Sequence, residues 1–156
     1  ALGMLKVTGD ENKQLYSGKQ TDGIYHPEGG TIQTMPGEEA VARKASNKEE
    51  RVEYGKSIYN KTCFACHQTE GEGIPGAFPP LAKSDFLHGN PENAIDIIMN
   101  GKNGKLTVNG KNYDGIMPAQ SLTDEQIANV LSFVYNSWGN NKTEVIPAMV
   151  EKRRKK

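Results

Sequence analysis

The stretch Cys63-Phe64-Ala65-Cys66-His67 decides how the rest of this sequence is interpreted. Two cysteines separated by two residues and followed directly by a histidine form the attachment signature of c-type haem. On a turn of helix, both cysteine side chains project to one side and can form thioether bonds to the two vinyl groups of the ring. His67 then lies beneath the ring, where a nitrogen can bind the iron. We therefore expect one covalent haem c at Cys63, Cys66 and His67.

Other uses of a close cysteine pair fit this sequence less well. The chain has only two cysteines, too few for a disulfide framework. A redox-active pair is typical of a thioredoxin-like βαβ setting, which the surrounding residues do not show. A structural zinc site needs a second pair of ligands, and no further cysteine is present.

The second axial ligand of the iron has to come from a segment that returns to the opposite face of the ring. Met117 lies in Gly115-Ile116-Met117-Pro118, which we interpret as an irregular loop before the last helix. It follows His67 by 50 residues (117 − 67), which is far enough to return to that face. Methionine paired with histidine is a known ligand set that favours reduced iron. We expect Met117 to be the ligand.

Other methionines and histidines are weaker candidates for this position. Met99 is expected to pack in the core, and His88 to lie at the surface in a polar turn, although it would be the ligand if two histidines bound the iron. Met4, Met35 and Met149 are expected to lie outside the compact part of the chain, and His26 is a further candidate.

The surroundings of the ring can also be predicted in part. His67 is expected to donate its other ring N–H to a backbone carbonyl, for which Pro79 or Pro80 is the candidate. Residues expected to line the haem pocket are Phe78, Pro80, Leu81, Ile98, Tyr113 and Leu131. Because two protein ligands would leave no open position on the iron, the site predicts electron transfer. No catalytic residues are expected in this chain.

Composition divides the chain of 156 residues into four segments. An extended arm is expected over residues 1–35, a polar linker over 36–47, a compact haem domain over 48–139 and a polar basic tail, interpreted as solvated, over 140–156. The 19 basic and 19 acidic residues cancel, so that no global charge favours binding to nucleic acid. No apolar run approaches the ~20 residues that span a bilayer.

Helices at both ends of the compact domain carry clear start signals. The first is expected to begin after Asn47, which can form a capping box with Glu50. Gly55 in its interior would be explained by the close approach of another helix. The last helix is expected to begin after Thr123 and to continue as far as Trp138, because its apolar residues recur at helical spacing.

A helix and a hairpin are expected between them. Asn90 can cap a helix over residues 91–100, whose buried stripe would be formed by Ala94, Ile97 and Ile98. The dipeptide Asn109-Gly110 between two extended stretches is a strong signal for a β-hairpin.

Residues 48–138 resemble a class I cytochrome c domain in the order of their helix, haem motif, Pro79-Pro80-Leu81 loop, middle helix, methionine loop and terminal helix. The resemblance implies a mainly α class I cytochrome c fold with a small β-hairpin, preceded here by an extended N-terminal arm. It also implies that the first and last helices cross, with Gly55 and Tyr59 against Val134 and Tyr135.

A second resemblance concerns the N-terminal arm and the proline-rich loop. Residues 1–9 and 24–30 resemble the end of the second cupredoxin domain of copper nitrite reductases, and residues 63–82 resemble the haem domain fused to some of them. This implies a part of a periplasmic, nitric-oxide-forming enzyme whose haem receives an electron from an upstream donor and passes it to a type 1 copper. Because both cysteines are assigned to haem, no copper is expected in this chain.

Two alternatives remain open from the sequence. The chain could be a freestanding periplasmic cytochrome c that serves another oxidoreductase. It could also be a haem sensor, which would require an open or weakly held sixth position on the iron.

Overall fold

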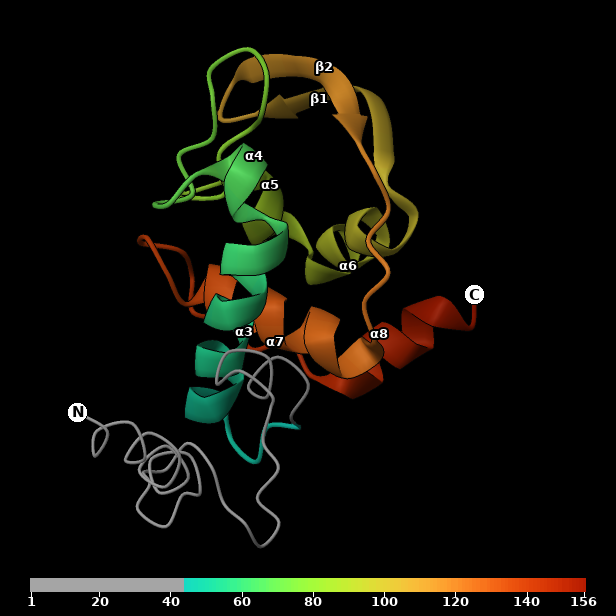
Figure 1. The fold of residues 1–156 in the computed structure, drawn as a ribbon. Coiled ribbons are helices and arrows are strands. Elements are labelled where there is room, and N and C mark those ends of the chain that lie inside the picture. Colours follow the sequence, from blue (N-terminus) through green and yellow to red (C-terminus); the bar gives the residue numbers. More distant parts are fainter. Residues whose placement is uncertain (1–43) are drawn as a thin grey trace, which may run out of the picture. The chain divides into compact units, whose positions relative to one another are not determined.

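The computed structural model describes residues 44–156, and the structural statements below concern this part of the chain (Figure 1). The expected arm of residues 1–35, most of the linker over 36–47, and the candidates Met4, Met35 and His26 lie outside the described residues.

The described part is mainly helical with one two-stranded antiparallel hairpin, as expected for a class I cytochrome c fold. In chain order its elements are α3 (Lys48–Thr62), α4 (Phe64–His67), α5 (Asp85–Gly89), α6 (Pro91–Asn100), β1 (Lys102–Val108), β2 (Lys111–Met117), α7 (Asp124–Tyr135) and α8 (Pro147–Arg154). Figure 1 shows α3 crossing α7, with α4 and the hairpin beyond the C-terminal end of α3. None of the helices described is both long and apolar enough to cross a bilayer.

Helix α3 begins where expected and packs against α7 through a glycine. The side chain of Asn47 accepts a hydrogen bond from the Glu50 amide at 2.8 Å, although the Glu50 carboxylate bonds the amide of Ser46. A Cβ atom on Gly55 would collide with the backbone carbonyl of Asn129 and would lie 2.8 Å from Cβ of Phe133. The glycine therefore permits the helices to touch, as expected.

The partners in this crossing differ from the expected ones. Gly55 meets Asn129 and Phe133, and the ring of Tyr59 packs against Phe133 with ring centroids 5.5 Å apart. Val134 and Tyr135, the expected partners, lie with Tyr59 in the same buried cluster and not against Gly55. The point of closest approach to Gly55 is therefore Asn129, about one turn of α7 before the expected position.

A buried arginine in the first turns of α3 connects this helix to α7. Arg51 of α3 is only 7% exposed, and its guanidinium donates to Glu125 at 3.1 Å and to the amide oxygen of Asn129 at 2.9 Å, both on α7. It also donates to Glu144, in the segment before α8, at 3.4 Å. A buried charge is tolerated when it is paired and hydrogen-bonded in this way.

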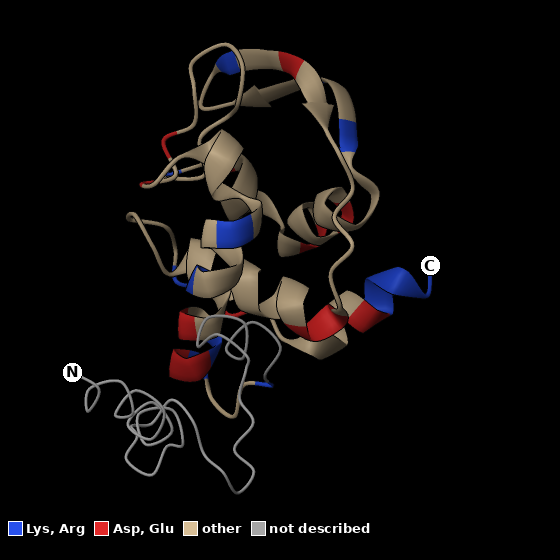
Figure 2. Cartoon of the chain, viewed as in Figure 1, with Lys and Arg blue, Asp and Glu red and all other residues tan. Residues whose placement is uncertain are grey.

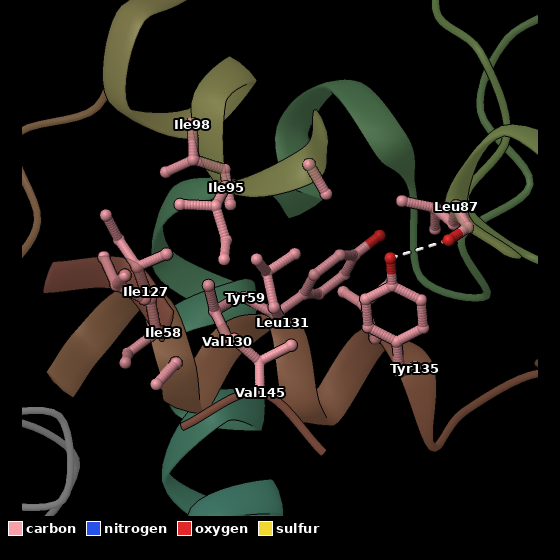
Figure 3. Packing of buried hydrophobic residues seen from close by; sticks show 14 residues of the cluster. Ile58, Tyr59, Leu87, Ile95, Ile98, Ile127, Val130, Leu131, Tyr135 and Val145 are labelled. Carbon is pink, nitrogen blue, oxygen red and sulfur yellow. Dashed lines mark hydrogen bonds between the residues drawn. The ribbon is translucent and has the colours of Figure 1, made fainter. Parts of the chain in front are cut away.

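The core lies between α3, α6, α7 and α8 (Figure 3). Tyr135 is fully buried there, and its hydroxyl donates to the Leu87 carbonyl at 2.7 Å, which ties α7 to α5. The largest apolar side chains with almost no exposure are Ile58, Tyr59, Ile95, Ile127 and Tyr135.

Helix α7 starts as expected but ends earlier. Thr123 and Gln126 form the predicted capping box. The helix stops at Tyr135, and Trp138 lies beyond it with a φ of 52° instead of forming its last turn. The tryptophan ring packs against Tyr59 at a centroid distance of 5.2 Å.

The hairpin is longer than predicted. Asn109 and Gly110 have φ values of 52° and 79°, as a two-residue turn of the expected kind requires. Strand β2 continues to Met117, which pairs with Lys102. The interpretation of Met117 as part of an irregular loop is therefore wrong, because the ladder holds it at the end of a strand.

The interpretation of the segment after Gly139 as a solvated tail is also wrong. Val145 and Val150 have no exposed surface, and α8 packs on α6 and α7. Met149, which was expected outside the compact part, packs against the same core.

Ion pairs explain why a basic sequence forms a docked helix. Arg153 donates to Glu92 at 3.0 Å and through Nε to Asp96 at 2.8 Å, both on α6, and Arg154 donates to Asp124 at 2.6 Å. Figure 2 shows these basic residues at the C-terminal end of the chain, close to acidic positions of the neighbouring helices.

We predict that Gly55→Ala will destabilise the protein by about 3 kcal/mol, since the new methyl group overlaps a backbone carbonyl that cannot move freely. The measurement is denaturant unfolding of the holoprotein. Gly89→Ala is the control: its Cβ would meet nothing within 4 Å, so stability should change by less than about 0.5 kcal/mol. Equal effects of the two substitutions would contradict the close crossing.

We also predict that Val150→Asp will lower the free energy of unfolding by about 3 kcal/mol or more, because it buries an unpaired carboxylate. Ile146→Asp tests the same change at a residue that is 42% exposed just before α8, where little loss is expected. If Val150→Asp were harmless in thermal unfolding, α8 would not be docked.

Candidate haem site

A two-lobed cavity opens beyond the C-terminal end of α3. Its outer and deep lobes have volumes of about 200 Å³ and 90 Å³. The residues that line both lobes are Cys63, His67, Pro79, Ile97, Leu106 and Met117. The two lobes therefore meet between the end of the haem motif and the end of β2.

All ten residues predicted to bind or surround the haem line this cavity. Besides the shared Cys63, His67 and Met117, the outer lobe is lined by Cys66, Phe78 and Tyr113. The deep lobe is lined by Pro80, Leu81 and Ile98, and also by Leu131. The fold thus brings residues from five separate segments together around one space.

His67 is held in one orientation by the loop that follows it. The residue is 8% exposed, and Nδ1 lies 2.9 Å from the Pro79 carbonyl oxygen, which confirms the predicted partner. A carbonyl can only accept, so Nδ1 carries the proton and Nε2 keeps its lone pair for a metal. Burial lowers the pKa of this imidazole, which favours the neutral form that binds metals.

The loop itself is fixed by backbone hydrogen bonds. The Gly73 amide donates to the His67 carbonyl at 3.0 Å, and the Leu81 amide donates to the Gly71 carbonyl at 2.7 Å. Ile74 and Phe78 form a short bridge within it. These bonds hold the Pro79 carbonyl beneath the imidazole.

The cysteines have the character of attachment points, not of a redox pair. The two cysteines form no disulfide, and Cys63 is partly buried whereas Cys66 is exposed. Burial, and secondarily Cys66, raises the pKa of the Cys63 thiol to about 12, whereas redox-active cysteines have a lowered pKa. Within residues 44–156, no three His, Cys, Asp or Glu side chains lie close enough together to hold a metal ion.

Met117 is the methionine of the described part that reaches the cavity. Met99 and Met149 pack against the hydrophobic core. The Nε2 atom of His88 lies 2.9 Å from the side-chain oxygen of Asn140 and is absent from the cavity wall.

Two residues that line both lobes, Ile97 and Leu106, were not predicted from the sequence. Ile97 was expected in the buried stripe of α6, but Ile95 occupies the core and Ile97 borders the cavity. Leu106 received no role, although it alternates along β1 with exposed residues and so lies on one face with Val108. That alternation was the available signal.

The cavity suits a haem. A flat, largely apolar ring matches walls made mostly of aliphatic, proline and aromatic side chains. The imidazole of His67 and the thioether of Met117 both border the space shared by the two lobes. When bound, the haem supplies an iron that cycles between two oxidation states.

Comparison with known proteins agrees with this assignment. The cytochrome c family model matches residues 52–138. A cytochrome c-552 of Thermus thermophilus is 42% identical over 93 residues, which cover 56% of this chain and 70% of that protein.

More distant relatives are subunits of larger enzymes. The cytochrome c subunit of an alcohol dehydrogenase (quinone) from Gluconacetobacter polyoxogenes is 34% identical over 98 residues, or 60% of this chain and 20% of that subunit. The gluconate 2-dehydrogenase cytochrome c subunit of Pantoea cypripedii is 32% identical over 121 residues, or 74% of this chain and 27% of that subunit.

The family match, the fold and the cavity all indicate a haem attached at the two cysteines of the chain. This chain belongs to the cytochrome c family, and it is an electron-transfer module that carries covalent haem c.

Proposed function

We propose that the haem iron is bound by Nε2 of His67 and the sulfur of Met117, and that Cys63 and Cys66 hold the ring through thioethers. The single observation that carries this proposal is the shared cavity wall, where His67, oriented by Pro79, and Met117, at the end of β2, border both lobes. With both axial positions filled, the haem exchanges single electrons without binding a substrate.

We predict that Met117→Ala will open one axial position. The reduced variant should then bind carbon monoxide rapidly and lose the sharp visible bands of the low-spin haem, whereas the unmodified protein binds it slowly. Met99→Ala is the control, because Met99 packs against the core. Unchanged spectra and carbon monoxide binding in Met117→Ala would refute the ligand assignment and favour another side chain.

We further propose that this chain is the haem-carrying part of a copper nitrite reductase and passes electrons to its type 1 copper. The support is the resemblance of residues 1–9 and 24–30 to the end of a cupredoxin domain, and of residues 63–82 to the haem domain of such enzymes. The chain would then work in the periplasm, where c-type haem is attached, and would receive its electrons from an upstream donor.

A second candidate follows from the relatives. A freestanding or subunit cytochrome c that accepts electrons from a dehydrogenase would agree with the similarity to cytochrome subunits of alcohol and gluconate dehydrogenases. In this case the chain is reduced by its partner, while in the first case it is oxidised.

The direction of electron flow separates the two. The reduced chain is mixed in a stopped-flow instrument with the copper core of a nitrite reductase in its oxidised form. Haem oxidation should coincide with bleaching of the type 1 copper absorption, and a copper core that lacks type 1 copper is the control. If oxidation is no faster than with this control, while a quinone-dependent dehydrogenase and its substrate reduce the oxidised chain, the second candidate is the correct one.

A further inference from the structure

The inner face of the hairpin carries an unusual set of side chains for the wall of an apolar cavity. By register, Lys102, Gly104 and Leu106 of β1 lie opposite Met117, Gly115 and Tyr113 of β2, and all six line the outer lobe. Apart from Cys63 and His67, which border both lobes, the deep lobe has Ser84 as its single polar side chain. The polar side chains that border only one lobe therefore lie mostly in the outer lobe, where Thr62, Lys102, Tyr113 and Gln120 are found.

Tyr113 is the buried group that the electron-transfer function leaves unexplained. It is 6% exposed, yet its hydroxyl has no hydrogen-bond partner among the described residues. The buried hydroxyls of Tyr59 and Tyr135 both donate to backbone carbonyls, at 2.5 and 2.7 Å. Leaving a buried hydroxyl without a partner costs about 1–3 kcal/mol.

The Tyr113 hydroxyl is not sealed inside the protein. Within residues 44–156, the sole sealed side-chain polar atom without a partner is Nδ2 of Asn129. The Tyr113 oxygen therefore borders open space, and the space that its side chain lines is the outer lobe. A ligand in this lobe would provide the missing acceptor.

Lys102 supplies a positive charge to the same lobe. It is partly buried and forms no ion pair with the residues described, and no Asp or Glu lines either lobe. The other charged hairpin residues, Lys105, Lys111 and Asp114, are exposed. Among the charged side chains of the hairpin, Lys102 is the one that borders the cavity.

The two glycines keep the face between these residues clear. Gly104 and Gly115 are register partners, and a Cβ atom would meet nothing within 4 Å on the first and only the Ala77 carbonyl, at 3.8 Å, on the second. The edge of a flat ring can therefore approach the strands, with Lys102 towards one end and Tyr113 towards the other.

We propose that the inner face of the hairpin binds the two carboxylates of the haem, with Tyr113 donating a hydrogen bond and Lys102 supplying the counter-charge. A haem is apolar except at the edge that carries its carboxylates, so the polar outer lobe takes this edge and the apolar deep lobe takes the opposite one. Both contacts offset the negative charge of the haem carboxylates near the iron. The oxidised iron, which carries one more positive charge, is then stabilised less, so the reduction potential rises.

The inference rests on the haem site of the proposed function, not on the identity of the redox partner. Its test compares the holoprotein with Tyr113→Phe and Lys102→Gln, each carrying haem labelled with carbon-13 at the carboxylates. Redox-induced infrared difference spectra report the labelled carboxylate bands, and equilibrium titration at fixed pH reports the reduction potential. Lys105→Gln, an exposed position on the same strand, is the matched control.

Each substitution should shift a labelled carboxylate band and lower the potential, while Lys105→Gln leaves the bands in place. Bands that coincide with those of the unmodified protein in both variants would overturn the proposal. So would a Tyr113→Phe variant that alters only the absorption from the sulfur–iron bond, because the hydroxyl would then serve Met117. If the unmodified protein itself showed no low-spin haem bands, that result would instead contradict the haem site of the proposed function.

Discussion

The contact between Gly55 of α3 and the backbone of Asn129 in α7 is the constraint on which the rest of the structure depends. A side chain at position 55 would force the helices apart, and α3 would no longer end beside the core. Since Cys63 and His67 follow α3 directly, the crossing determines where the haem motif lies. Arg51 reinforces it by joining both helices to the segment before α8.

The two proposed axial ligands of the haem iron are positioned in different ways. His67 is positioned locally, by one turn of helix and a loop that places the Pro79 carbonyl 2.9 Å from Nδ1. Met117 is positioned at long range, by the strand pairing that sets it opposite Lys102. In the proposed arrangement, the iron joins these two otherwise independent segments, so that the haem completes the core. This agrees with a chain in which only 35% of the residues are apolar.

Features encoded by neighbouring residues could be predicted from the sequence. Asn47 and Thr123 cap their helices, and Asn109-Gly110 makes the turn of the hairpin. The sequence predicts these features because they depend on short-range hydrogen bonds and on the backbone preferences of single residues. The haem motif at Cys63 was recognisable for the same reason, since its residues are adjacent in the chain. Long-range contacts decided the rest. Helix α8 was missed because Arg153 is docked by acidic residues of α6 that are distant in sequence. The arm and its resemblance to a cupredoxin lie outside the described residues.

The account depends most directly on a thioether sulfur bound to the iron opposite an imidazole. Iron K-edge X-ray absorption on the purified, oxidised holoprotein measures the atoms bonded to the metal without any substitution. We expect one sulfur bonded to the iron in addition to nitrogen atoms of the ring and of His67. Nitrogen or oxygen alone around the iron would contradict the account, because the end of β2 would then not provide the second axial ligand.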